Sequence, residues 1–171
     1  VEYAQRTDEK GLLHLELQRA FLAGELPFRR EDRGRKRILD LGCGPGINTV
    51  ALAMIFSDCE IVALDVANDQ ASWATQAILN RGLKNVTVTR TAFEDFADLG
   101  FDFILASHVL QYIDTPVMRF VKKIRECLRP GGEAWIVLQE EAGINQIVQS
   151  AVPFLTHPHP YLKRWFTHAT V

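Results

Sequence analysis

Short apolar runs and helix-like segments alternate along the middle of this chain. Five runs rich in branched and aromatic residues are typical of strands, at residues 37–41, 60–64, 86–89, 101–106 and 133–138. Between them, apolar positions recur at helical spacing over residues 47–56, 69–81 and 116–128. Strands that alternate with helices predict a parallel sheet covered on both faces. The expected fold is α/β, with a doubly wound, mainly parallel sheet in three α/β/α layers.

Glycine and proline mark the ends of several predicted elements. Gly82 closes the second of these helices, and Pro116 opens the third at an early helical position. The run Pro130-Gly131-Gly132 predicts a sharp break before the last strand. Trp73 and Trp135 fit the apolar faces of their elements, so we expect both in the core.

The chain of 171 residues, 47% of them apolar, is long enough to bury one core of ordinary size. We expect a single domain with three parts. Residues 1–35 form an N-terminal helical segment and linker, residues 36–140 form the core, and residues 141–171 form a C-terminal segment, for which truncation is one reading. The first segment contains a helix capped by Asp8, with its apolar face over residues 12–22. Residues 142–155 also read as helical.

Charge and hydropathy restrict the expected partners. No run of about 18 apolar residues is present, and the first residues do not form a secretory signal, so we expect a cytoplasmic protein without a membrane span. A net charge of −2 and a pI near 6.2 argue against a polyanion as main partner. The basic stretch 29–37 also carries acids and reads as a solvated connector. No nucleic-acid partner is expected.

Candidate metal ligands are sparse in the sequence. Cys43, Cys59 and Cys127 lack the paired spacing of a zinc site or a disulfide framework, and we expect them to be buried thiols. His157 and His159 have no third ligand nearby. We therefore expect no metal.

A glycine turn follows the first predicted strand. The strand 37–41 runs into Gly42-Cys43-Gly44-Pro45-Gly46, and a helix restarts immediately afterwards. This arrangement leaves backbone N–H groups unpaired where no side chain blocks approach. Asp65 lies 19 residues past Gly46, near the spacing of about 20 at which an acidic side chain meets a ribose bound over such a loop. The pattern predicts a cradle for a nucleoside cofactor.

The spacing of the glycines separates two kinds of cofactor. A dinucleotide fingerprint has its third glycine where this chain has Ile47, which argues against a nicotinamide-dependent oxidoreductase. Together with the strings at residues 61–65, 101–110 and 128–132, the segment 39–46 resembles the motifs of class I S-adenosylmethionine-dependent methyltransferases. The resemblance covers about residues 37–138.

This resemblance implies a role for each loop at the carboxyl edge of the sheet. The glycine turn is expected to hold the methionine portion of S-adenosylmethionine, Asp65 the ribose, and the loop after the third strand the adenine. The implied cofactor-binding residues are Asp40, Gly42, Cys43, Gly44, Asp65, Val66, Phe93, Glu94 and Ser107. Many members have an acid where this chain has Ala92, so adenine recognition falls to the Phe93 backbone, or to Glu94 or Asp95 if these are not simply solvated.

The expected chemistry is an in-line methyl transfer, in which the protein aligns donor and acceptor and excludes water. His108 is the candidate catalytic residue, because a neutral imidazole can orient or deprotonate an acceptor; its alternative is local packing at a helix start. Ser107 either caps the following helix or places its carbonyl near the cofactor's ammonium group. By resemblance, Tyr3 and Arg6 fold over the cofactor.

We expect the acceptor to be a small molecule, methylated on oxygen or nitrogen. A non-catalytic module of the same fold is the alternative, since Ala92 and the short carboxyl end depart from the family pattern. A nicotinamide-dependent oxidoreductase is the third candidate. The sequence does not determine the oligomeric state.

Overall fold

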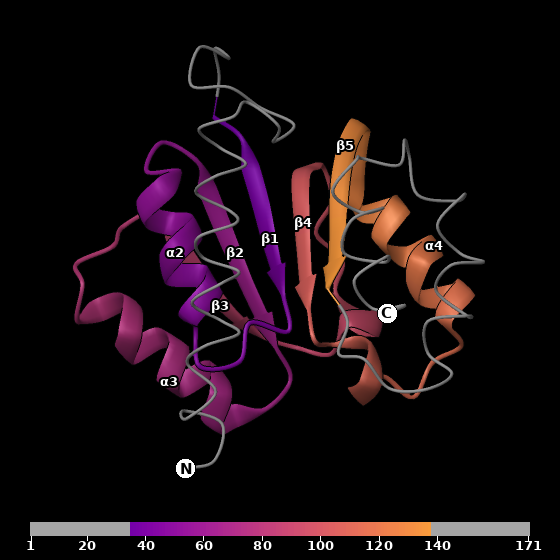
Figure 1. Ribbon diagram of the computed structural model, residues 1–171, viewed down its shortest axis with the longest axis horizontal. Coiled ribbons are helices and arrows are strands. Elements are labelled where there is room, and N and C mark those ends of the chain that lie inside the picture. Colours follow the sequence, from indigo (N-terminus) through magenta and orange to yellow (C-terminus); the bar gives the residue numbers. More distant parts are fainter. Residues whose placement is uncertain (1–34, 138–171) are drawn as a thin grey trace, which may run out of the picture.

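The computed structural model describes residues 35–137, which contain a five-stranded parallel sheet (Figure 1). The strands lie in the order β3-β2-β1-β4-β5. They span Arg37–Leu41 (β1), Glu60–Asp65 (β2), Val86–Arg90 (β3), Phe101–Ser107 (β4) and Leu128–Val137 (β5). The described helices are α2 (Ile47–Ile55), α3 (Asn68–Leu79) and α4 (Val117–Cys127), with short 3-10 helices η2 (Phe93–Asp95) and η3 (Leu110–Tyr112). The predicted doubly wound α/β fold is confirmed.

Side chains of each strand alternate between two packed faces, because successive residues of a strand point to opposite sides. Leu39 of β1 belongs to the apolar cluster that includes Ile124 of α4. Its neighbour Ile38 belongs to a second cluster, which includes Leu52 of α2. All four side chains are fully buried. The sheet is therefore the middle of three layers.

The register of the strands decides which residues meet at the carboxyl edge. Leu41, the last residue of β1, pairs with Leu64 of β2 on one side and with Ala106 of β4 on the other. The next residue of each strand or turn therefore emerges at the same edge, where the arrowheads lie in Figure 1. Strand order reverses at β1, and ligands of doubly wound sheets bind at such a point.

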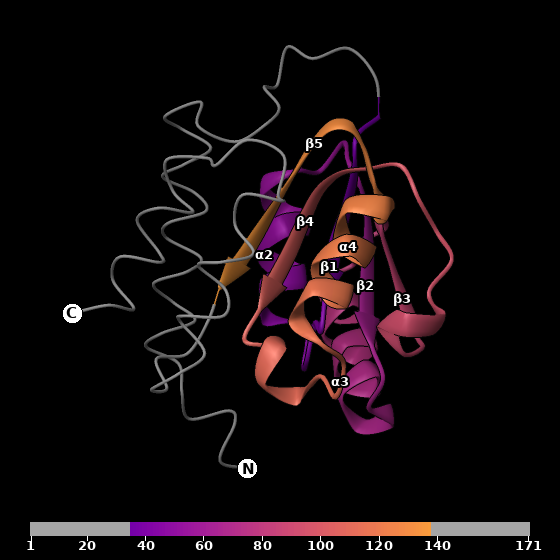
Figure 2. The same ribbon diagram turned by 90° about the vertical axis from the view of Figure 1, so that its right-hand side faces the viewer.

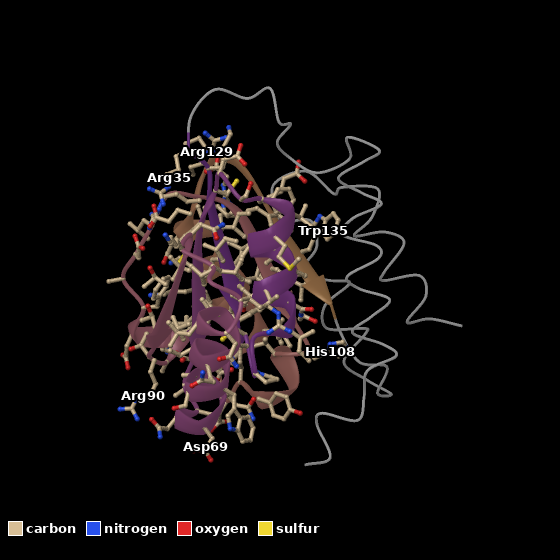
Figure 3. The ribbon with its side chains drawn as sticks, turned by 90° about the vertical axis from the view of Figure 1, so that its left-hand side faces the viewer. Arg35, Asp69, Arg90, His108, Arg129 and Trp135 are labelled. Atoms are coloured by element: carbon tan, nitrogen blue, oxygen red, sulfur yellow. The ribbon has the colours of Figure 1, made fainter. Side chains whose placement is uncertain are left out.

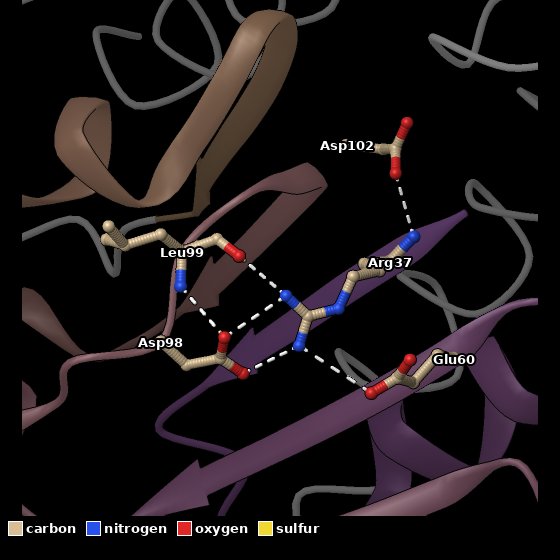
Figure 4. A network of polar contacts seen from close by, with 5 residues as sticks. All are labelled: Arg37, Glu60, Asp98, Leu99 and Asp102. Atoms are coloured by element: carbon tan, nitrogen blue, oxygen red, sulfur yellow. Dashed lines mark hydrogen bonds and ion pairs between the residues drawn. The ribbon is translucent and has the colours of Figure 1, made fainter. Parts of the chain in front are cut away.

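The opposite edge of the sheet is held by Arg37 (Figure 4). Its guanidinium lies 2.6 Å from the Asp98 carboxylate and 3.6 Å from Glu60, and it donates to the Leu99 carbonyl. Its backbone N–H donates to Asp102 at 2.8 Å. The hydrogen bond between Arg37 and Asp98 raises the pKa of Arg37 and lowers that of Asp98. These contacts tie β1 to β2, to β4 and to the segment before β4.

The last described strand differs from its prediction. The sequence analysis places it at residues 133–138 after a break, whereas β5 begins at Leu128 and includes the proline and both glycines. The pairing with β4 shifts register between Phe101 and Phe103. A Cβ on Gly132 would lie 2.7 Å from the Phe101 carbonyl oxygen. The glycine thus allows a tight irregularity within the strand, and the chain does not break there.

Of the two tryptophans expected in the core, one is misplaced. Trp135 is 2% exposed and packs edge to face on Phe103, with ring centroids 5.4 Å apart. Trp73 is 51% exposed, so its prediction is wrong. The buried face of α3 consists of Ala71, Ala74 and Ile78, which recur at helical spacing. Trp73 lies on the opposite side of the helix, so its ring faces away from the core.

Several predictions concern residues outside the described range. These are the helix capped by Asp8, the cover formed by Tyr3 and Arg6, the basic residues before position 35, the helix at 142–155, and the pair His157 and His159. The single-domain organisation also stays a prediction. Within the described residues, no helix has the length and apolar character needed to cross a membrane.

Candidate cofactor site

A cavity of about 760 Å³ lies at the carboxyl edge of the sheet. Ligand pockets in proteins typically measure about 300–1,000 Å³. The structure brings together at this cavity His108 and every implied cofactor-binding residue except Asp40: Gly42, Cys43, Gly44, Asp65, Val66, Phe93, Glu94 and Ser107. Asp95, the other acid considered for adenine recognition, does not line the cavity. Their individual roles stay predictions.

Asp40 lies beneath the glycine turn and does not line the cavity. It is 1% exposed, and the Thr49 hydroxyl donates to its carboxylate at 2.5 Å. The pair joins the end of β1 to the first turns of α2. Asp40 is enclosed in this way, and its contact with a cofactor stays a prediction.

The Asp65 carboxylate links two loops of the site. One oxygen accepts a hydrogen bond from the Gly44 N–H at 2.8 Å, and the other accepts from the Ala67 N–H at 2.9 Å. The glycine turn is fixed further by Gly42 and Cys43, whose N–H groups both donate to the Leu64 carbonyl. The expectation that the turn leaves its N–H groups unpaired is therefore wrong, because the turn is held by its neighbours in the structure. A carboxylate oxygen can accept more than one hydrogen bond, so both oxygens keep capacity for ligand hydroxyls.

The three glycines of the turn serve different neighbours. All have positive φ, a conformation that strains other residues. A Cβ on Gly42 would overlap the side chain of Val109, and one on Gly46 would lie 2.9 Å from Ala74 of α3. A Cβ on Gly44 would meet only the Gln70 side-chain oxygen, at 3.6 Å. Gly44 is therefore the glycine that keeps open space at the cavity.

The loop after β3 forms another wall of the cavity. Phe93 is 7% exposed and packs edge to face on Phe120 of α4, with ring centroids 5.3 Å apart. The Glu94 carboxylate accepts a hydrogen bond from the Thr115 hydroxyl at 2.9 Å, and its carbonyl accepts from the Lys123 ammonium at 3.2 Å. Glu94 thus connects this wall to the loop before α4.

Ser107 and His108 end β4 at the cavity. The Ser107 hydroxyl lies 3.1 Å from His108 Nδ1. His108 has a φ of 56°, in the left-handed region that side chains rarely adopt. Neither η3 nor α4 has a side-chain cap, so the capping role considered for Ser107 is wrong. Figure 3 shows His108 at the end of the sheet opposite to Arg129.

Cys43 is buried within the turn, as expected for a structural thiol. It is 5% exposed, and burial is the main cause that raises its pKa far above the usual range. The neighbouring carboxylates of Asp40 and Asp65 act in the same direction. The thiol stays protonated at neutral pH, so Cys43 contributes shape and backbone atoms to the site and does not act as a nucleophile.

Sequence reasoning missed two amides in the cavity wall. Asn48 Oδ1 and Gln70 Oε1 are buried without a hydrogen-bond partner among the described residues. An unpaired buried acceptor is unfavourable, so both atoms suit a ligand that donates hydrogen bonds. The only available signal was their position at the starts of the helices after β1 and β2.

The loop between β4 and α4 was also missed beyond His108. The cavity wall there includes Val109, Tyr112, Ile113, Asp114 and Thr115. These residues reach the cavity because the chain forms η3 between β4 and α4. The sequence offers one signal for this, since the segment between β4 and Pro116 is too long for a tight turn.

A parallel sheet with this strand order, a glycine turn after β1 and a carboxylate after β2 defines a nucleoside-binding α/β domain. Residues 38–132 match the family described as Methyltransferase domain. The chain belongs to this family, and its fold is that of the class I S-adenosylmethionine-dependent methyltransferases. This family agrees with the one that the sequence motifs resemble.

Known relatives share parts of the chain. The ribosomal RNA small subunit methyltransferase G of Chromohalobacter salexigens is 29% identical over 113 residues, covering 66% of this chain and 51% of that protein. Its namesake in Methylococcus capsulatus is 36% identical over 72 residues, covering 42% of this chain and 35% of the relative. This chain thus spans about half or less of their length. An S-adenosylmethionine-dependent methyltransferase structure from Aquifex aeolicus has a TM-score of 0.57 at 20% identity, covering 69% of this chain and 73% of the other.

These relatives correct one prediction. The sequence analysis expects a small-molecule acceptor and no nucleic-acid partner, whereas both curated relatives are named for ribosomal RNA. The earlier expectation came from the net charge of −2, which averages over the whole chain. Such an average does not report the charge of a single surface, and it is a weak criterion for excluding a polyanion.

Proposed function

We propose that this chain binds S-adenosylmethionine in the cavity at the carboxyl edge of the sheet and methylates an RNA base. The observation that carries the cofactor site is the Asp65 carboxylate, which accepts from the Gly44 and Ala67 N–H groups beside an open cavity of about 760 Å³. The chain's similarity to enzymes named for ribosomal RNA supports the choice of acceptor.

Each wall of the cavity suits one part of the cofactor. Asp65 would accept hydrogen bonds from the ribose hydroxyls, and the space over Gly44 would take the methionine portion. The unpaired oxygens of Asn48 and Gln70 suit the donor hydrogens of its ammonium group. Phe93 offers an aromatic surface for adenine. Ala92 supplies no side-chain acceptor, which leaves ring-edge recognition to the backbone of this loop.

S-adenosylmethionine supplies a methyl group on a positively charged sulfonium. The protein's contribution is alignment of the acceptor and exclusion of water. His108 borders the cavity with Nδ1 beside the Ser107 hydroxyl, so this contact orients the imidazole ring. We propose that His108 positions the acceptor base. Only some acceptor atoms must lose a proton during methylation, so positioning is the role of His108 that holds for every acceptor atom. A His108 variant that keeps its affinity for the cofactor and loses transfer rate separates this role from cofactor binding.

We also propose that this chain acts in the cytoplasm, the location expected from the sequence, and its relatives named for ribosomal RNA support this.

The exposed ring of Tyr112, at the cavity wall, is a suitable surface for an unstacked base.

The proposal is tested with radiolabelled S-adenosylmethionine and purified small-subunit ribosomal RNA. We expect label in the RNA with the wild-type chain and strongly reduced label with Asp65→Ala. His108→Ala should lower the transfer rate while the Kd for S-adenosylmethionine changes less than about twofold. Asp58→Asn, an exposed change outside the cavity wall, is the control. Cofactor binding without transfer to any RNA would contradict the acceptor and favour a non-catalytic module.

A further inference from the structure

Positive charge is concentrated on one described helix. The 11 residues of α4 include Arg119, Lys122, Lys123 and Arg125, against the single acid Glu126. By contrast, α2 has no charged residue, and α3 has only an aspartate. The chain as a whole carries a net charge of −2. The covering layers of the sheet therefore differ in charge, and the basic one is α4.

The basic side chains of α4 that face away from the sheet follow one another at regular spacing. Arg119, Lys122 and Arg125 are exposed and lie three residues apart, a step of about 60° around a helix axis. Neither arginine forms an ion pair with another described residue, and Lys122 pairs with Glu126 only at 3.9 Å. An exposed pair of this length contributes little and is readily exchanged. Figure 2 views the molecule from the side of α4.

This surface is continuous with the cavity mouth. The cavity wall includes Asp114 and Thr115, and α4 begins only two residues later, at Val117. Lys123 of α4 donates a hydrogen bond to the carbonyl of Glu94, another residue of the wall. Among the described elements, the start of α4 therefore lies next to the cavity wall.

An exposed aromatic side chain lines the cavity in the segment that leads to α4. Tyr112 is 70% exposed although it lines the cavity wall. Exposed aromatic rings beside basic residues are characteristic of single-stranded nucleic-acid sites, where the ring stacks on a base and the cations follow the phosphates.

We infer that RNA binds along α4, with phosphates on Arg119, Lys122 and Arg125, and with the nucleotide next to the target base stacked on Tyr112. This inference rests on the proposed function, because it assigns the binding surface of the same RNA. The surface positions the substrate, and the residues that hold the cofactor are separate from it.

The test measures binding of a fluorescent single-stranded RNA, taken from small-subunit ribosomal RNA, by anisotropy between 50 and 250 mM salt. The variant is the triple change Arg119→Gln, Lys122→Gln and Arg125→Gln. Each lost phosphate contact on a single strand lowers the slope of log K against log salt by about 0.7, so the slope should fall by about 2. Affinity near 0.1 M salt should fall on the order of 10- to 100-fold.

A matched control removes the same charge elsewhere, with Arg35→Gln, Arg81→Gln and Lys84→Gln. These residues are exposed and do not line the cavity, and Figure 3 shows Arg35 at the end of the sheet away from His108. The control should keep most of the RNA affinity. Both triple variants should bind S-adenosylmethionine like the wild type. In turnover, the α4 variant should raise KM for RNA more than it lowers kcat.

Tyr112 is tested separately. Tyr112→Ala should weaken RNA binding about tenfold through loss of stacking, and Tyr112→Phe should restore it.

A second measurement needs no variant. Amine-reactive labelling of the wild-type chain should be slowed by RNA at Lys122 and unchanged at Lys84. Equal RNA affinities of the two triple variants, with no protection of Lys122, would overturn the α4 surface while leaving RNA methylation intact. Failure of the wild type to bind or methylate any RNA, with normal cofactor binding, would overturn the RNA acceptor and the surface together.

Discussion

Replacement of Asp65 by asparagine changes the site with almost no change in shape. The carboxylate accepts from the Gly44 N–H at 2.8 Å and from the Ala67 N–H at 2.9 Å. Asparagine has a single side-chain oxygen, so its amide NH2 would face one of these two donors. One backbone N–H then loses its partner, and one proposed acceptor for the ribose is lost as well.

The size of the effect follows from the type of hydrogen bond. A hydrogen bond to a charged group contributes about 1.5–3 kcal/mol, and the cavity is open to water on one side, which places the ribose contact at the lower end. A loss of about 1.5–2 kcal/mol corresponds to about a 10- to 30-fold increase in the Kd for S-adenosylmethionine. The freed backbone N–H group should also lower the unfolding temperature slightly.

Isothermal titration with S-adenosylmethionine and with S-adenosylhomocysteine measures this loss. Asp58→Asn removes the same charge from an exposed position that does not line the cavity, and its Kd should match that of the wild type. Thermal melts of each variant separate a weakened site from an unfolded chain. An Asp65→Asn variant that melts like the wild type and binds within twofold of it would refute the assignment of Asp65 to the ribose.

Three further changes test neighbouring parts of the account. Gly44→Ala should lower stability by about 1 kcal/mol, as measured by melting, because of the positive φ at this position. It should also weaken cofactor binding, as measured by titration, because the added methyl group would occupy cavity space proposed for the cofactor. Thr49→Val removes a hydrogen bond to the buried Asp40 carboxylate, so the free energy of unfolding in urea should fall by about 1.5–3 kcal/mol. Arg37 lowers the pKa of Asp98, so this pair stabilises the fold above the unfolded-state pKa near 4 and loses its contribution as pH falls below it. Asp98→Asn should therefore destabilise by under about 1 kcal/mol at pH 7 and have almost no effect near pH 2, as measured by melting at both values.

The strands were predictable because their apolar runs are short, continuous and bounded by turns. The predicted strand at residues 37–41 coincides with β1, and the other predicted boundaries lie close to the observed ones except at β5. There, Gly132 was interpreted as a breaker, although it relieves a close approach to the Phe101 carbonyl inside the strand. Contacts across a sheet decide which of these two roles a glycine has, and a single sequence does not contain them.

The site was predictable as far as residues directly follow strands. Register alone brings Gly42, Asp65 and Ser107 to one edge, so the alternating pattern was enough to place them together. Residues that reach the cavity from helix starts, such as Asn48 and Gln70, depend on helix orientation, which the pattern does not give. The charge of α4 was hidden for another reason, since net charge averages over all surfaces.

The central claim is that the turn around Gly44 and the carboxylate of Asp65 bind one nucleoside together. A crystal structure of the chain with S-adenosylhomocysteine tests it directly. The account predicts both ribose hydroxyls within about 2.6–3.2 Å of the Asp65 oxygens, with the amino-acid portion over Gly44. A ligand bound elsewhere, or one whose ribose faces away from Asp65, would contradict it.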